Sequence, residues 1–130
     1  MVTSMKSDGL VARADVAAVR RTYAGLTNRQ LGRFAEYHVT MALVRGGLDV
    51  YTPAIDDRGI DLIARLGTAH YVEIQVKATR GLKYVFMRKQ VFPIHPNRYL
   101  AYVHFGGDDE PTIYLVPSTV WQVPDDLFVS

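Results

Sequence analysis

The sequence predicts an α/β fold, and the order of its elements is what predicts it. A well-marked helix is expected at about 28–45, two alternating strands at 59–66 and 70–78, and a short helical piece at 117–121. A helix, then strands, then further helical residues are typical of an α/β or α+β sandwich, in which helices cover a sheet. A length of 130 residues is that of one domain and is sufficient to bury a core.

Composition favours a soluble cytoplasmic protein. The chain has no cysteine, so it offers neither a disulfide framework nor a thiolate metal site. Its apolar runs stay well short of the roughly 20 residues that a membrane-spanning helix needs, and the polar segment 1–10 lacks the apolar stretch of a signal peptide. Residues 1–26 are expected to be an extension or a short Ala-rich helix near 10–24, and residues 27–122 the core.

Charge is unevenly distributed, although the net charge is only +2. The interval between Glu73 and Asp108 has no acidic residue and contains Lys77, Arg80, Lys83, Arg88, Lys89 and Arg98. Acidic residues follow it, at Asp108, Asp109, Glu110, Asp125 and Asp126. Charge segregated in this way can form a positive face. Ordinary solvated surface charges are the alternative interpretation, and the sequence leaves both open.

The helix at 28–45 has clear signals at both ends. Thr27 and Gln30 fit a capping box, and Gly46-Gly47 supplies a stop. Positions at helical spacing would form its buried face: Leu31, Phe34, Ala35, His38, Val39 and Ala42.

The hairpin formed by 59–66 and 70–78 has a register that burial decides, because a slip of one residue would turn the apolar side chains to the wrong face. Pairing Leu62 with Ile74 across the loop Gly67-Thr68-Ala69 keeps both apolar sets on one side. The same register sets Asp61 opposite Gln75 on the polar face.

Other elements are marked less strongly. Further strands are expected at 48–52, 83–88, 98–105 and 112–116. The piece at 117–121 is expected to be a short helix capped by Ser118 or Thr119.

Polar side chains on the hairpin suggest a metal site. Hard cations such as Mg²⁺ prefer oxygen ligands, and Asp61, the Gln75 amide and the Val76 backbone carbonyl can supply three. Lys77 projects on the same face as Gln75, where its ammonium could orient a water and stabilise charge that develops on a phosphate. Glu73, one pleat away, could hold a water or a ligand of the metal.

Three segments resemble the successive motifs of the PD-(D/E)XK nuclease superfamily: Gly32-x-x-x-Glu36, Gly59-Ile60-Asp61-Leu62-Ile63 and Glu73-Ile74-Gln75-Val76-Lys77. The resemblance spans roughly residues 30–80. It implies a restriction-endonuclease-like fold, with a central mixed β-sheet flanked by α-helices, and Mg²⁺ or Mn²⁺ as cofactor. It also implies that the helix and strand carboxylates and the amide help to hold the metal and that the lysine acts on the attacking water. Those roles fall to Glu36, Asp61, Gln75 and Lys77.

Gln75 departs from the commoner Glu and is similar to the variant found in some methylation-dependent restriction enzymes. It removes one negative charge, so weaker metal affinity is expected. The alternative interpretation is a polar sheet face wetted by solvent, in which Glu73 and Lys77 pair with their neighbours. Exposed pairs of that kind stabilise by only ~0–1 kcal/mol, so stability gives little reason to assemble them.

The remaining candidates point to packing. His38 is expected to be a packed or hydrogen-bonded residue and not a ligand, and His70, His95 and His104 lack metal-ligand spacing. Trp121 and Phe128 are expected in the core or in a dimer contact. Four aromatic residues interleave with the basic interval and could stack on bases, but strand packing is the favoured interpretation: Tyr84, Phe86, Tyr99 and Tyr102.

The function expected from these features is Mg²⁺-dependent hydrolysis of phosphodiester bonds in DNA, with water attacking in line. Phosphate contacts are expected from Arg80, Lys83, Arg88, Lys89 and Arg98. Cleavage that selects DNA structure, as in the similar-sized Holliday-junction resolvases, fits a small homodimer. The alternative is a catalytically inactive nuclease-fold module that binds nucleic acid or a protein partner.

Overall fold

The computed structural model describes residues 23–81, 84–107, 109–125 and 127–128. Its elements are α2 (Asn28–Arg45), β1 (Asp49–Tyr51), β2 (Leu62–Leu66), β3 (His70–Arg80), β4 (Arg98–Phe105), β5 (Thr112–Pro117) and the 3₁₀ helix η1 (Ser118–Gln122). The helix expected near 10–24 lies outside the described residues except at Tyr23 and Ala24, which belong to a turn. The described residues thus form an α/β structure, as the sequence predicts.

The boundaries of α2 confirm the capping signals. The Thr27 hydroxyl accepts a hydrogen bond from the Gln30 backbone N–H at 3.1 Å, and the Gln30 side chain accepts one from the Thr27 N–H at 2.9 Å. The helix ends at Gly46, and Gly47 adopts a φ of 89°, which favours glycine. Its buried residues are spaced four apart: Leu31, Ala35, Val39 and Leu43.

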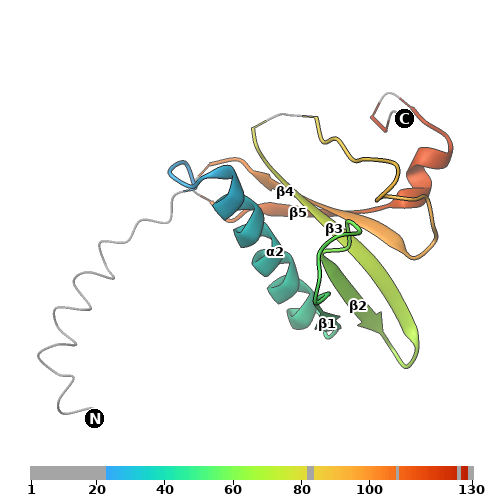
Figure 1. Cartoon of the computed structure of the whole chain (residues 1–130). Helices are drawn as coiled ribbons and strands as arrows, with labels where there is room; N and C mark the ends of the chain where they lie inside the picture. Colours follow the sequence, from blue (N-terminus) through green and yellow to red (C-terminus); the bar gives the residue numbers. More distant parts are fainter. Residues whose placement is uncertain (1–22, 82–83, 108, 126, 129–130) are drawn as a thin grey trace, which may run out of the picture.

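One face of a five-stranded sheet packs against this helix, as Figure 1 shows. The strands lie in the order β1-β2-β3-β4-β5, with β3 and β4 parallel and every other neighbouring pair antiparallel. The sheet is therefore mixed, as expected. Strand residues in the core beneath the helix are Leu62, Ala64, Val72, Ile74, Ala101, Val103 and Phe105.

The hairpin register agrees with the prediction, but β2 is shorter than expected. Leu62 lies opposite Ile74, and Leu66 lies opposite His70. The ladder stops at Leu62, so the expected pairing of Asp61 with Gln75 is not part of it.

The strand expected at 83–88 is wrong for 84–88, the part that the structure describes. Because β3 and β4 are parallel, the chain must return from the end of one to the start of the other. The connection 81–97 makes this return, seen as the yellow trace in Figure 1. Along 73–80 one edge of β3 is paired with β4, and 84–88 takes no place in the sheet.

The second face of the sheet is covered differently from the first. In the described part of the chain, α2 is the one α-helix, so the expected flanking helices are found on one face only. Phe92 of the connection is buried and packs edge-on against Trp121, which packs in turn against Phe128. Trp121 and Phe128 therefore contribute to packing within the chain.

Ser118 does not cap η1, contrary to expectation. It is fully buried, and its hydroxyl accepts from the His95 N–H at 2.9 Å and donates to the His95 carbonyl at 2.7 Å. The residue at the N-cap is Pro117, and Thr119 makes no cap bond either. The serine thus fixes the connection to the end of the sheet instead.

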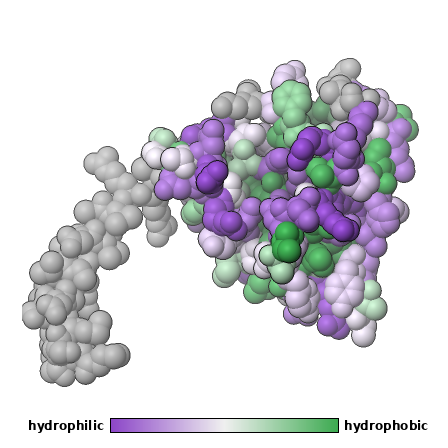
Figure 2. Space-filling model, viewed as in Figure 1, coloured by the Kyte–Doolittle hydropathy of each residue, from purple (hydrophilic) through white to green (hydrophobic). Residues whose placement is uncertain are grey.

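The surface seen in Figure 2 is covered largely by hydrophilic residues, with smaller apolar patches between them. Across the described ranges, no helix is long and apolar enough to cross a membrane.

Candidate active site

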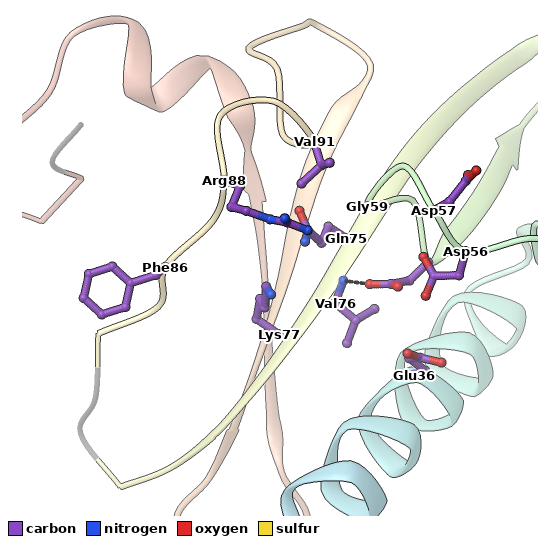
Figure 3. A pocket seen from close by; sticks show the side chains of 11 residues that line it. Glu36, Asp56, Asp57, Gly59, Gln75, Val76, Lys77, Phe86, Arg88 and Val91 are labelled. Carbon is purple, nitrogen blue, oxygen red and sulfur yellow. Dashed lines mark hydrogen bonds between the residues drawn. The ribbon is translucent and has the colours of Figure 1, made fainter.

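A cleft of about 540 Å³ lies beside the start of β2, and most of the expected site residues line it. The helix contributes Glu36, and β3 contributes Gln75, Val76 and Lys77. The remaining lining residues come from the loop before β2 and from the connection after β3: Asp56, Asp57, Gly59, Asp61, Phe86, Arg88 and Val91. Figure 3 shows how these side chains approach one another.

Asp61 occupies the place where the antiparallel ladder breaks off. Its backbone N–H donates to the Ile74 carbonyl at 2.9 Å. Continued by two residues, the register of Leu62 with Ile74 would pair Ile60 with Val76. Instead the Asp61 carboxylate accepts the Val76 N–H at 2.7 Å, the dashed line in Figure 3. The side chain therefore lies against the backbone of β3, next to the cleft.

The Val76 carbonyl faces the same side of β3 as its N–H, because both groups of a strand residue point to one neighbour. That side is the one occupied by Asp61, and the ladder with β2 has already ended there. The opposite side belongs to β4, as the bond from the Glu73 N–H to the Asn97 carbonyl shows. The carbonyl expected as a metal ligand is thus directed toward the Asp61 side of the cleft.

Gln75 is buried, with 7% of its surface exposed, although it is a polar residue that lines the cleft. Its Oε1 atom has no hydrogen-bond partner among the described residues. A buried amide oxygen without a partner costs free energy, about 1–3 kcal/mol, and such an atom calls for a physical reason. A cation bound in the cleft would supply one.

The two carboxylates at the site have perturbed acidity. Burial raises the pKa of Glu36, and the neighbouring Asp61 raises it further. Burial also raises the pKa of Asp61; the hydrogen bond from Val76 opposes this rise, and Asp56 adds to it. Partly desolvated carboxylates close together favour either a proton or a metal ion between them.

Lys77 lies where the sequence places it, on the lining of the cleft beside Gln75. Its positive charge opposes the rise that burial causes in the pKa of Asp61. The ammonium and the carboxylate belong to the lining of one cleft.

Two expected site residues do something else. Arg98 is buried at 2% exposure, so it is not available for phosphate contact as predicted. Its guanidinium donates to the carbonyls of Gly59 at 3.0 Å, Arg58 at 3.3 Å and Val91. Glu73 does not line the cleft and pairs with Arg98, with 3.6 Å between Oε1 and the guanidinium nitrogen. Arg98 and Glu73 therefore stabilise the segments around the cleft and do not line its interior.

The other basic residues expected to bind nucleic acid differ in availability. Arg88 and Lys89 are exposed, and Arg88 extends toward Gln75 in Figure 3. Arg80 is partly buried, and its guanidinium donates to the Leu26 carbonyl. Lys83 lies outside the described residues.

Sequence reasoning missed Asp56, which lines the cleft and whose charge raises the pKa of Asp61. It also missed Asp57 and Val91 as lining residues. The signal for the acidic pair was the doublet Asp56-Asp57 shortly before Gly59, a composition that is also typical of turns.

The residues present fit a hard divalent cation. Nowhere in the described ranges do three or more His, Cys, Asp or Glu side chains form a ligand group by themselves. A site here would therefore combine the carboxylates with neutral oxygens, namely the unpartnered Gln75 Oε1 and the Val76 carbonyl. Oxygen donors of mixed charge are what Mg²⁺ and Mn²⁺ accept.

Comparisons of the chain with protein-family profiles, with curated protein sequences and with solved structures find no match.

Proposed function

We propose that this protein is a Mg²⁺- or Mn²⁺-dependent nuclease of the restriction-endonuclease-like fold, related to the PD-(D/E)XK superfamily, that hydrolyses phosphodiester bonds in DNA. One observation carries the proposal. Glu36 of α2, Asp61 before β2, and Gln75 and Lys77 of β3 line a single cleft. The spacing that suggested the motifs extends over some 40 residues of sequence. A solvated strand face alone would not bring Glu36 of the helix to the same place.

The carboxylates of Asp61 and Glu36, the Gln75 amide oxygen and the Val76 carbonyl would hold the metal. When bound, the ion would supply positive charge that polarises the phosphodiester and makes a water molecule more acidic. The chain itself holds two of these ligand groups in place. Asp61 is fixed by the Val76 N–H, and Gln75 is fixed by burial.

Lys77 would orient the attacking water and stabilise charge on the phosphate, since its ammonium group lines the same cleft as the carboxylates. Arg88 would hold a neighbouring phosphate, because it is exposed and lines the same cleft. Contacts to phosphate position a nucleic acid without reading its sequence. We therefore propose selection by DNA structure, with a homodimer presenting two such clefts.

A second candidate is a catalytically inactive nuclease-fold module that binds nucleic acid or a protein partner. Gln75 is the observation that favours it, because the amide lacks the charge of the commoner Glu. Removing one ligand charge weakens the attraction for a divalent cation in a partly desolvated site. This module would keep the exposed Arg88 and Lys89 as its docking residues.

Metal titration by calorimetry, together with a cleavage assay on labelled linear and branched DNA, separates these candidates. The nuclease takes up Mg²⁺ or Mn²⁺ and produces shorter fragments that chelation abolishes. The inactive module binds DNA, takes up no metal and cleaves neither substrate.

A further inference from the structure

The segment 84–88 presents aromatic side chains to solvent. Tyr84 is 85% exposed and Phe86 is 83% exposed, whereas Val85 and Met87 between them are partly buried. This alternation is that of an extended chain, in which every second side chain points to one side. The favoured interpretation of Tyr84 and Phe86 as packed strand residues is therefore wrong.

The Tyr84 and Phe86 rings contribute little to the stability of the fold, because they bury almost no apolar surface. The sequence around them is basic. Arg88 and Lys89 follow directly and are exposed, and the whole interval from 74 to 107 contains no acidic residue. Aromatic rings interleaved with cations suit a ligand that combines flat bases with anionic phosphates.

Phe86 connects this segment to the proposed active site. It lines the cleft together with Arg88 and Lys77 while remaining exposed, so it lies at the opening of the cleft. In Figure 3, Arg88 extends toward Gln75, and Phe86 lies beyond Lys77 at the outer side. A strand held at Lys77 by a phosphate would leave the cleft past this ring.

We propose that Tyr84 and Phe86 stack on unpaired bases of a single-stranded DNA segment that adjoins the scissile phosphate; this inference rests on the proposed function and names its substrate class. Residues in an extended chain rise about 3.3 Å each, so the Cα atoms of the two aromatic residues are spaced by roughly 6.6 Å. Bases along one strand are stacked about 3.4 Å apart. The spacing of the two residues is therefore on the scale of about two base steps.

Single-stranded DNA fits this surface better than duplex or a second protein chain. In a duplex the faces of the bases are covered by their neighbours, so exposed rings have nothing to stack on. A protein partner would have to cover the rings without leaving Arg88 and Lys89 unpaired beside them. Phosphates next to unpaired bases satisfy both requirements at once.

The test measures binding, in the absence of divalent metal, to a labelled duplex with single-stranded extensions and to the same duplex with blunt ends. Fluorescence anisotropy reports both affinities for wild type and for the double variant Tyr84→Ala/Phe86→Ala. The double variant Tyr84→Leu/Phe86→Leu keeps apolar side chains but removes the ring faces. Tyr37→Ala is the matched control, because Tyr37 is an exposed aromatic residue on α2 outside the cleft.

Both double variants are expected to lose affinity for the extended DNA by roughly fivefold or more per ring, and to bind blunt duplex as wild type does. Tyr37→Ala should bind both as wild type does. Equal losses on the two DNAs, or no loss on either, would overturn the proposal. So would a changed oligomeric state of the alanine variant in sedimentation, because the rings would then belong to a protein interface.

Cleavage with Mg²⁺, measured separately, distinguishes the two levels of the proposal. If wild type neither binds metal nor cleaves, while the double variants still lose the preference for extended DNA, the stacking holds and the nuclease proposal fails. If wild type cleaves and the double variants bind like wild type, the stacking fails and the nuclease proposal stands.

Discussion

The carboxylate of Asp61 accepts a hydrogen bond from the backbone N–H of Val76 at 2.7 Å, and this bond replaces the next rung of the hairpin ladder. It leaves the carboxylate held by main chain at the edge of the cleft. It also leaves the Val76 carbonyl, on the same side of the strand, beyond the end of the ladder with β2. The candidate metal site therefore lies where the pairing of β2 with β3 ends.

Asp61→Asn should lose metal binding but keep the fold. The asparagine amide oxygen can still accept the Val76 N–H, while the negative charge that attracts the cation is gone. Metal titration of the folded variant checks this. Uptake equal to that of wild type would show that Asp61 is not a ligand.

Gln75→Glu should tighten metal binding and lower stability when metal is absent. The new carboxylate would be buried beside Asp61, and like charges in a desolvated site repel one another. Added Mg²⁺ should then raise the melting temperature of this variant more than that of wild type. Thermal unfolding with and without Mg²⁺ makes the comparison, and identical shifts for both proteins would contradict the assigned role of Gln75.

Stability of the metal-free protein should depend on pH through Glu36 and Asp61. Both have a raised pKa in the folded state, above ordinary values of 4.5 and 3.8. The folded state therefore binds more protons than the unfolded state between the ordinary and the raised values. The contribution of the two carboxyl groups to the free energy of unfolding is fully present below their ordinary pKa values. It is lost as the pH rises through the raised pKa values of the folded state.

The double variant Glu36→Gln/Asp61→Asn removes this dependence. Compared with it, metal-free wild type should become relatively more stable as the pH is lowered through that window. Unfolding midpoints measured across the acidic range provide the comparison. Parallel pH profiles for the two proteins would mean that the pKa values are not raised by folding.

Arg98→Ala should destabilise the fold strongly, by about 3 kcal/mol or more. The change leaves the carbonyls of Gly59 and Arg58 without a donor and the Glu73 carboxylate without its partner. Arg88→Ala is the control, since the exposed Arg88 should change stability by only about 0.5 kcal/mol or less. Urea unfolding measures both, and equal effects would disprove a structural role for Arg98.

The local signals in the sequence predicted local structure well. The ends of α2 and the hairpin register follow from capping chemistry and from burial of one strand face, both of which act over a few residues. Asp61 was expected directly opposite Gln75 in the ladder; both residues line the cleft, but the ladder ends before Asp61. A strand residue is expected to alternate, and the hydrogen bond to Val76 becomes visible only once the ladder is seen to end at Leu62.

Contacts between residues far apart in the chain could not be predicted from the sequence. The parallel pairing of β3 with β4 requires the chain to return between the two strands, and nothing within 84–88 reveals this. Arg98 looked like a surface cation because its partners are backbone carbonyls from 58–59 and 91, which carry no sequence signature. Tyr84 and Phe86 lie in this returning connection and are exposed.

Cleavage of labelled DNA by wild type and by Lys77→Ala, with Mg²⁺ present, tests the central claim most directly. Lys77 lines the cleft without being a metal ligand, so its loss should abolish cleavage while fold and metal uptake remain. Arg45→Ala, an exposed change at the far end of α2, should cleave as wild type does. Equal cleavage by wild type and Lys77→Ala would contradict the assigned role. Failure of both wild type and Gln75→Glu to cleave or to take up metal would contradict the nuclease itself and leave the inactive binding module.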